Sequence, residues 1–177
     1  LLGEQRLVDP GAQGGTVNLS FDPGAGANST IYRVIPYTFD LIPPLGVYVT
    51  RYWVGGDFTT FGAQSRPRIA ICEADGTLYT GFAPGTGFNN TVFALAVLGD
   101  GDAVVGGTFS SYNGTPVNYL ARLNRAGALD ATFTPPALNG YVFCAAVSLR
   151  PFLGGWREDA IWIGGSFAGG VKKLYYI

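Results

Sequence analysis

The 177-residue sequence predicts an all-β protein built from three copies of one structural unit. The first observation is the composition: 27 glycines and 14% aromatic residues stand beside only 13% charged residues, which suits short strands joined by tight turns. The second is a Gly-Gly-x-Phe motif that occurs three times. The third is that Gly or Pro interrupts every window in which apolar residues might follow a helical spacing. Together these observations favour strands along the whole chain.

The two repeated motifs fix half of the repeat length. Gly-Gly-x-Phe ends at Phe58, Phe109 and Phe167, and a second signature, Gly-x-Leu/Val with Phe four residues later, ends at Phe21, Phe82 and Phe133. Gly55 to Phe82 spans 27 residues (82 − 55), and Gly106 to Phe133 spans the same number (133 − 106). Because repeats of constant length form equivalent structures, we expect these six phenylalanines to fill equivalent positions in the core.

Units of about 50–60 residues with four short strands match the blade of a β-propeller. The sequence therefore predicts one domain, a β-propeller-like array of three four-stranded repeats. The repeat boundaries are 1–20 (the end of a repeat), 21–81, 82–132 and 133–177, of which the last is incomplete. The alternative is a β-trefoil, which also contains three four-stranded repeats. The constant spacing of the motifs favours the propeller.

The strands are expected where β-branched and aromatic residues gather. They lie at 31–37, 47–54, 68–73 and 77–79 in the first repeat, at 92–98 and 103–105 in the second, and at 141–149, 161–163 and 171–177 in the third. Two segments are longer than their counterparts, 36–46 and 150–159. Since Pro43 and Pro44 cannot continue a central strand, we expect enlarged loops there, both on the same side of the molecule.

These motifs resemble the delta-60 repeat, a propeller-type repeat of bacterial surface and phage proteins. The resemblance is clearest from Leu123-Asn124-Arg125 through Gly127-Ala128-Leu129 to Phe133, and from Phe82 to the Gly-Gly-x-Phe motif at Phe109. Thr134-Pro135-Pro136 replaces the Pro-Gly loop in the third repeat. The resemblance implies a propeller fold and a place on a virion or a bacterial surface, and it brings no enzymatic residues.

Composition excludes several classes of function. The net charge is −1 and no run of Lys or Arg occurs, so nucleic acid is not an expected partner. No apolar stretch approaches the roughly 20 residues of a membrane helix, and no membrane insertion is expected. The sequence contains no Met, from which we expect a processed chain or part of a longer protein. Cys72 and Cys144 are expected to be buried free thiols.

Catalytic and metal sites find little support in the residue types present. The absence of His excludes His-based triads and His-ligated metals, and two Cys cannot complete a thiolate zinc site. We therefore expect no enzyme, no metal and no cofactor. Two weaker functional hypotheses remain open. They are calcium binding by Asp100 and Asp102, and a propeller glycosidase using two of the carboxylates Asp57, Glu73, Glu158 and Asp159.

The aromatic residues of the two enlarged segments are the best functional lead, because turns normally carry small polar groups there. The candidate binding residues are Tyr37, Phe39, Phe152, Trp156 and Arg157. The competing explanation is that they pack over the end of the propeller itself. The sequence thus predicts a non-enzymatic structural or binding module, extracellular or on a virion, that mediates assembly or attachment. Its expected partners are other subunits of a larger assembly or a cell-surface glycan, and a carbohydrate-binding adhesion module is the alternative.

Overall fold

The structure is a computed structural model that describes residues 22–40, 45–152 and 155–175. Every regular element within these ranges is a β-strand, and no helix occurs among them. Accordingly, the described residues contain no helix that is long and apolar enough to cross a membrane. The all-β prediction is confirmed for this part of the chain.

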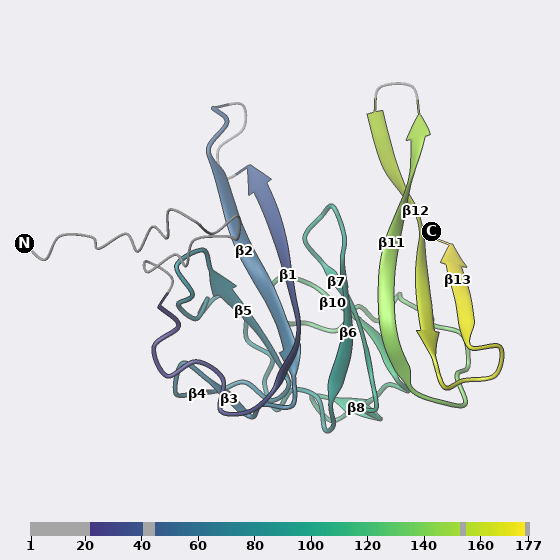
Figure 1. The fold of residues 1–177 in the computed structure, drawn as a ribbon, viewed down its shortest axis with the longest axis horizontal. Coiled ribbons are helices and arrows are strands. Elements are labelled where there is room, and N and C mark those ends of the chain that lie inside the picture. Colours follow the sequence, from purple (N-terminus) through teal and green to yellow (C-terminus); the bar gives the residue numbers. More distant parts are fainter. Residues whose placement is uncertain (1–21, 41–44, 153–154, 176–177) are drawn as a thin grey trace, which may run out of the picture.

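Three antiparallel sheets stand side by side in the order of the chain (Figure 1). Sheet 1 has the order β1-β2-β5, sheet 2 the order β6-β7-β10, and sheet 3 the order β11-β12-β13. Their strands are β1 (Ile31–Asp40), β2 (Tyr48–Gly56), β5 (Ile69–Glu73), β6 (Val92–Val97), β7 (Ala103–Gly107), β10 (Leu120–Leu123), β11 (Val142–Phe152), β12 (Gly155–Gly165) and β13 (Val171–Tyr175). The sheets approach each other most closely at their first strands, β1 to β6 and β6 to β11.

Two small hairpins connect the second strand to the third in sheets 1 and 2. They are β3 (Thr60–Phe61) with β4 (Gln64–Ser65), and β8 (Ser111–Tyr112) with β9 (Thr115–Pro116). The Asn113-Gly114 turn of the second hairpin has positive φ at both residues, 46° and 79°, which is the conformation that an Asn-Gly hairpin loop favours. In sheet 3 the chain passes from β12 to β13 without such a hairpin.

The predicted fourth strands are reduced to single bridges. Leu78 bridges to Cys72 on the edge of sheet 1, and Leu129 bridges to Leu123 on the edge of sheet 2. Leu78 is flanked by only two ladder hydrogen bonds, Glu73 N to Thr77 O (2.8 Å) and Tyr79 N to Ile71 O (2.9 Å). A longer strand does not form because the chain turns after Tyr79 to begin the next repeat.

The Gly-Gly pairs mark close approaches of backbone. At the second glycine of each pair, a Cβ atom would collide with the carbonyl oxygen of the residue just before the first strand. The residue after the pair donates its N–H to that same oxygen. The three hydrogen bonds are Asp57 N to Thr30 O (2.8 Å), Thr108 N to Thr91 O (3.0 Å) and Ser166 N to Tyr141 O (3.0 Å). Glycine is therefore required at these positions, because a side chain would not fit between the two backbone segments.

Each first strand carries a β-bulge near its start, and the bulged residue is aromatic in all three sheets. The register shifts fall between Ile31 and Arg33, between Val92 and Ala94, and between Val142 and Cys144. The residues left over are Tyr32, Phe93 and Phe143. Their rings form a row, with centroids 4.8 Å apart from Tyr32 to Phe93 and 5.6 Å apart from Phe93 to Phe143. The row ties the first strands of the three sheets together.

The core consists of layers between and beside the sheets. One layer lies between sheets 1 and 2 and includes Trp53, Val92 and Val105. A second lies between sheets 2 and 3 and includes Val104 and Val142. A third lies on the other face of sheet 1. The repeat phenylalanines are distributed over all three layers: Phe58, Phe82 and Phe109 are fully buried, Phe167 is 3% exposed and Phe133 is half-buried. Phe21 lies outside the described residues.

The expectation of two buried thiols is wrong for one of them. Cys72 is buried, and burial raises the pKa of its thiol to about 11. Cys144 is exposed. Its counterpart in sheet 2, Ala94, is buried against sheet 3, whereas Cys144 lies on the face of sheet 3 that turns away from sheet 2.

Candidate functional site

Two long hairpins project from the same side of the molecule (Figure 1). Hairpin 1 consists of β1 and β2, and hairpin 3 consists of β11 and β12. β1 has 10 residues and β11 has 11, whereas β6 in the middle sheet has only 6. The segments 36–46 and 150–159 were expected to be loops, but their described residues largely extend the strands. The expectation that they share one side agrees with the described parts of both hairpins; the tips, 41–44 and 153–154, lie outside the described residues.

Pro36 does not interrupt β1, because β1 is the edge strand of its sheet and only its partner side needs amide donors. Beyond Pro36, alternate residues of β1 face sheet 2, and these include Tyr37 and Phe39. Tyr37 is 7% exposed and lies within the core between sheets 1 and 2. Burial raises the pKa of its phenol, opposed by the nearby Arg51. Tyr37 is therefore part of the packing that holds the base of hairpin 1.

Phe39 continues this packing outward. Its ring stacks on that of Tyr37, with centroids 5.6 Å apart and planes inclined by 18°. Two guanidinium groups cover it, that of Arg51 at 5.2 Å from the ring centroid and that of Arg125, from the turn after β10, at 5.6 Å. Arg51 also lies 3.6 Å from the centroid of the Tyr79 ring. Cation–π contacts of this kind leave little of the Phe39 ring for a flat ligand.

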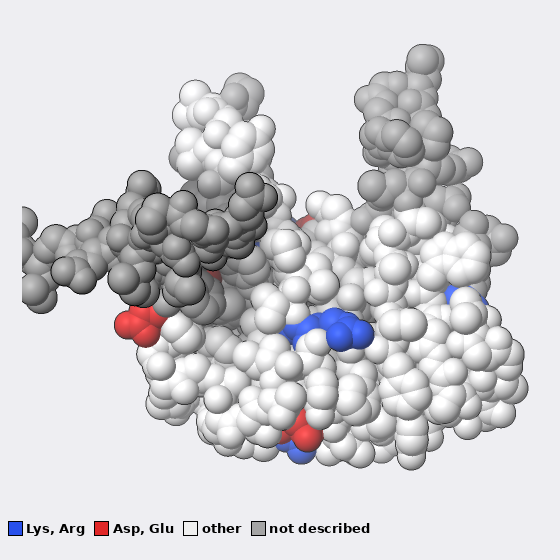
Figure 2. All heavy atoms as spheres, viewed as in Figure 1, with Lys and Arg blue, Asp and Glu red and all other residues white. Residues whose placement is uncertain are grey.

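Three exposed apolar side chains near the outer end of hairpin 1 were not among the predicted binding residues. Leu45 is 74% exposed, Val47 is 42% exposed and Tyr48 is 68% exposed. Tyr48 is the first residue of β2, and Leu45 and Val47 lie in the segment just before it. On the face seen in Figure 2, no Lys, Arg, Asp or Glu is coloured on the described part of this projection, and the side chain of Asp40, whose backbone pairs with Tyr48, lies outside the described part of the structure. The sequence contains a signal for these residues, because the run of β-branched and aromatic residues continues outward beyond the part of hairpin 1 that is buried in the core.

Hairpin 3 holds the other predicted binding residues, Phe152, Trp156 and Arg157. The structure describes only the backbone at these positions, with Phe152 at the end of β11 and the other two in β12. The backbones of Trp156 and Pro151 pair across the hairpin. The side chains of the three residues lie outside the described part of the structure.

The turn with Asp100 and Asp102 already holds a cation of its own. Arg122 Nη2 lies 2.8 Å from Asp100 Oδ2 and 3.1 Å from Asp102 Oδ2, and Arg122 Nε lies 3.5 Å from Asp130 Oδ2. The guanidinium thus occupies the place where a calcium ion would have to bind. Among the described residues, no group of three or more His, Cys, Asp or Glu could hold a metal ion.

Two of the carboxylates considered for a glycosidase are far apart. Glu73 accepts a hydrogen bond from Arg51 Nε at 2.9 Å, and Arg51 pairs with Glu73 across β2 and β5. Asp57 follows the opposite end of β2 and accepts a hydrogen bond from Thr91 Oγ1 at 2.7 Å. The six residues from Arg51 to Asp57 span about 20 Å of strand, well beyond the separation of about 5–9.5 Å that glycoside hydrolysis requires. The side chains of Glu158 and Asp159 lie outside the described part.

A family model described as "Domain of unknown function (DUF5122) beta-propeller" matches residues 98–133. The chain is similar to a propeller-type repeat family. The matched segment contains the Asp100–Asp102 turn, β7, the β8–β9 hairpin and β10, and it ends at Phe133. The three sheets are called blades from here on. Neither the comparison with curated proteins nor that with solved structures found a match.

Proposed function

We propose that this protein is a non-enzymatic module of the delta-60 kind that uses hairpin 1 to contact another macromolecule. It acts outside the cell, on a virion or on a bacterial surface, in assembly or attachment. The observation that carries the proposal is the exposure of Leu45, Val47 and Tyr48, which lie at and just before the start of β2. Contiguous exposed apolar side chains are typical of contact sites.

The base of hairpin 1 supports this role mechanically. Tyr37 and Phe39 fix the lower part of the hairpin against blade 2, and the Arg51 ion pair with Glu73 (2.9 Å) fixes its second strand to β5. A contact residue on a strand that is held in this way loses little conformational entropy when it binds. The hairpin is therefore suited to present its outer residues to a partner.

The proposal is tested by binding of the fluorescently labelled protein to intact bacterial cells and to purified phage particles. In the double variant Leu45→Ser, Tyr48→Ser we expect saturable binding to weaken about 30- to 700-fold, because two apolar contacts of about 1–2 kcal/mol each are lost. The melting temperature should stay unchanged, since both side chains are exposed. Thr38→Ala on the same hairpin serves as the control and should bind normally. The proposal is contradicted if the protein binds neither to cells nor to phage particles. It is also contradicted if the double variant binds as tightly as the wild-type protein.

The exposed ring of Tyr48 favours a second candidate, a carbohydrate-binding adhesion module. An aromatic face stacks well on the apolar face of a sugar ring, and its hydroxyl can hydrogen-bond to the sugar. A printed glycan array distinguishes the two candidates. Binding to defined glycans that Tyr48→Ser abolishes supports the carbohydrate candidate, whereas binding to particles alone supports the protein contact.

A further inference from the structure

A group of hydrogen-bond donors lies between blades 1 and 2 at the base of hairpin 1. Tyr37 pairs with Arg51 and Arg51 pairs with Glu73, so these residues form one row across β1, β2 and β5. Tyr37 belongs to the core between the two blades, so the row faces blade 2. From blade 2, the guanidinium of Arg125 lies 5.6 Å from the centroid of the Phe39 ring, which that of Arg51 approaches to 5.2 Å. Two positive charges from different blades thus meet at one ring.

Gly101, in the turn from β6 to β7, makes room for this meeting. Its φ is 86°, and a Cβ atom there would lie 2.6 Å from Arg125 Cδ and 3.3 Å from Tyr37 Cδ2. The stem of Arg125 and the ring of Tyr37 therefore both pack against the bare backbone of the turn. Gly101 O accepts a hydrogen bond from Trp53 Nε1 at 3.1 Å, which ties the turn to blade 1. The turn thereby holds the two side chains next to each other.

Several donors of this group have no acceptor. Among the described residues, Arg125 forms no ion pair and donates no side-chain hydrogen bond. Arg51 donates from Nε alone, to Glu73 Oε2 at 2.9 Å. Tyr37 is 7% exposed, and its hydroxyl is buried without a hydrogen-bond partner. Arg51 is close enough to oppose the rise that burial causes in the pKa of Tyr37, but the two groups do not reach hydrogen-bond geometry. A buried hydroxyl without a partner destabilises the fold, and an acceptor bound from outside would remove that cost.

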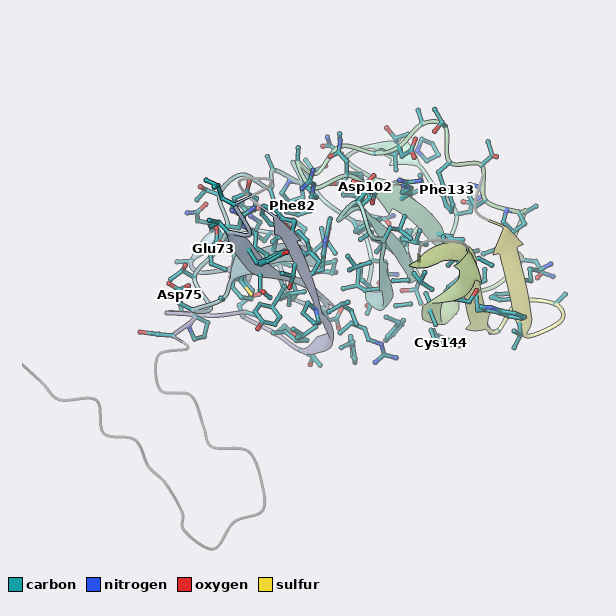
Figure 3. The ribbon with its side chains drawn as sticks, turned by 90° about the horizontal axis from the view of Figure 1, so that it is seen from above. Glu73, Asp75, Phe82, Asp102, Phe133 and Cys144 are labelled. Atoms are coloured by element: carbon teal, nitrogen blue, oxygen red, sulfur yellow. The ribbon has the colours of Figure 1, made fainter. Side chains whose placement is uncertain are left out.

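Two carboxylates beside this group are engaged elsewhere. Figure 3 shows them, Glu73 in blade 1 and Asp102 in blade 2. Glu73 pairs with Arg51, and Asp102 pairs with Arg122 at 3.1 Å. Burial raises the pKa of Asp102 and the charge of Arg125 acts against this rise, yet no ion pair joins these two residues. The exposed guanidinium of Arg125 therefore keeps its full set of donors.

We propose that this group binds an oxyanion, the carboxylate, sulfate or phosphate group of a ligand that approaches beside hairpin 1. Arg125 donates two parallel hydrogen bonds to the oxyanion, Arg51 donates one from its free end, and Tyr37 donates its hydroxyl once the exposed Arg125 side chain has moved toward the ligand. A planar guanidinium fits two oxygen atoms of such a group in this way. The negative charge also relieves the repulsion between the two guanidinium groups. The site is separate from Leu45 and Tyr48, so it does not depend on the proposed contact of hairpin 1.

Titration followed by heteronuclear NMR tests the site. The probes are sodium sulfate, sodium phosphate and methyl glucuronide, and the controls are sodium chloride at equal ionic strength and the neutral methyl glucoside. We expect saturable shifts at the amides of 98–102 and 124–127 with at least one oxyanion and with neither control. Tighter binding of the glucuronide than of both inorganic anions assigns the site to an acidic sugar, and any other order assigns it to a free anion. Saturation by no oxyanion, or equal saturation by a control, would overturn the proposal.

Arg125→Gln removes one guanidinium without touching the core. We expect oxyanion binding to weaken about 10- to 100-fold, because charged hydrogen bonds are lost, while the melting temperature stays nearly unchanged. Arg125→Lys keeps the charge without the planar fork and should recover only part of the affinity. Arg33→Gln is the matched control, since it removes the same charge from an exposed residue of β1 about 13 Å of strand away from Tyr37. Unchanged binding by Arg125→Gln, or an equal loss in Arg33→Gln, would overturn the proposal.

Tyr37→Phe separates ligand binding from packing. Without ligand, this variant should be at least as stable as the wild-type protein, because it loses a buried hydroxyl that has no partner. Its affinity for the oxyanion should be about 10-fold weaker, because the hydroxyl donates to the ligand in the complex. Thermal denaturation with and without the oxyanion, together with the NMR titration, measures both effects. Equal affinity of the variant and the wild-type protein would overturn the role given to the hydroxyl, whatever the stability of the variant.

Discussion

At the scale of single residues, the same few side chains perform the same task in each repeat. Asn28 and Asn89 illustrate this: each amide oxygen accepts two backbone N–H groups just after the Gly-Gly-x-Phe motif, at 2.8 and 3.0 Å for Asn28 and at 2.9 and 3.1 Å for Asn89. Asn139 accepts one, from Ala168 N at 2.9 Å. Because these oxygens are held by backbone donors, the asparagines fix the start of each first strand to the end of the second.

The repeat phenylalanines allow a quantitative prediction. We expect Phe109→Ala to lower the free energy of unfolding by about 3–5 kcal/mol, since the ring is fully buried between blades and its removal leaves a cavity. Chemical denaturation monitored by tryptophan fluorescence measures the change. Leu45→Ala, at a site that is 74% exposed, is the control and should change stability by less than about 0.5 kcal/mol. A loss below about 1 kcal/mol for Phe109→Ala would show that the ring is not an essential core residue.

How far single residues can be predicted from the sequence depends on whether the repeat defines them. The burial of Phe58, Phe109 and Phe167 follows from their shared place in the Gly-Gly-x-Phe motif, because a repeated motif places its side chain in a repeated environment. The sequence could not show that Tyr37 is buried while Tyr48 is exposed. Both are aromatic residues of the same hairpin, and only the length of hairpin 1 relative to blade 2 separates them.

At the scale of elements, the turn from β6 to β7 is fixed to β10 by a cluster of charges. Arg122 on β10 contacts Asp100 and Asp102 of the turn, and Asp100 Oδ1 also accepts the N–H of Asp102 at 2.9 Å. Burial, together with the charge of Asp100, raises the pKa of Asp102, and Arg122 acts against this rise. The charge of Arg122 therefore offsets the repulsion among Asp100, Asp102 and Asp130, and the three carboxylates can lie close together in the folded protein.

We expect Arg122→Gln to lower the free energy of unfolding by about 2 kcal/mol at pH 7, because charged hydrogen bonds are lost and the carboxylates repel each other. Without Arg122 the pKa of Asp102 in the folded state rises further above its unfolded value. A raised pKa in the folded state means that stability falls as the pH rises through the carboxyl range. The loss of unfolding free energy caused by Arg122→Gln should therefore be smallest near pH 3 and grow toward neutral pH.

Denaturation curves between pH 3 and 7 measure this dependence. Arg33→Gln is the control, since it removes the same charge from an exposed residue of β1, outside the cluster. If the deficit of Arg122→Gln does not change with pH, the cluster does not act through its carboxylates.

At the scale of elements, the sequence predicted the existence of the strands better than it predicted where they begin and end. The first and second strands of each repeat are where β-branched and aromatic residues indicated. Prolines and bulky groups favour loops at 36–46 and 150–159, but Pro36 and Pro151 lie on edge strands, where proline is tolerated. Whether a strand is at an edge is decided by the pairing of the whole sheet, which local sequence does not contain.

At the scale of the whole molecule, the three blades differ in how much of each is covered. Blade 2 is packed on both faces, by blade 1 and by blade 3, whereas the outward face of blade 3 carries the exposed Val171 and Cys144. The propeller-like array itself could be predicted from the repeats. The unequal exposure of its ends could not, because equivalent residues have the same sequence character whether or not a neighbour covers them.

Hydrogen–deuterium exchange should show this difference. The amides of β7 should exchange most slowly and those of β12 at least 10-fold faster, because blade 2 is covered on both faces whereas blade 3 has an exposed outward face. Equal protection of β7 and β12 would contradict this expectation.

The fit of one residue type into one kind of space at every blade boundary also bears on how such a protein changes over generations. Because Gly55 and Gly106 make room for Val92 and Val142 of the next blades in the same geometry, a repeat that is duplicated or deleted as a whole leaves only boundaries of a kind already present. We therefore expect a chain with one whole repeat more or fewer to fold, whereas the gain or loss of part of a repeat should break the pairing of glycine and valine at once.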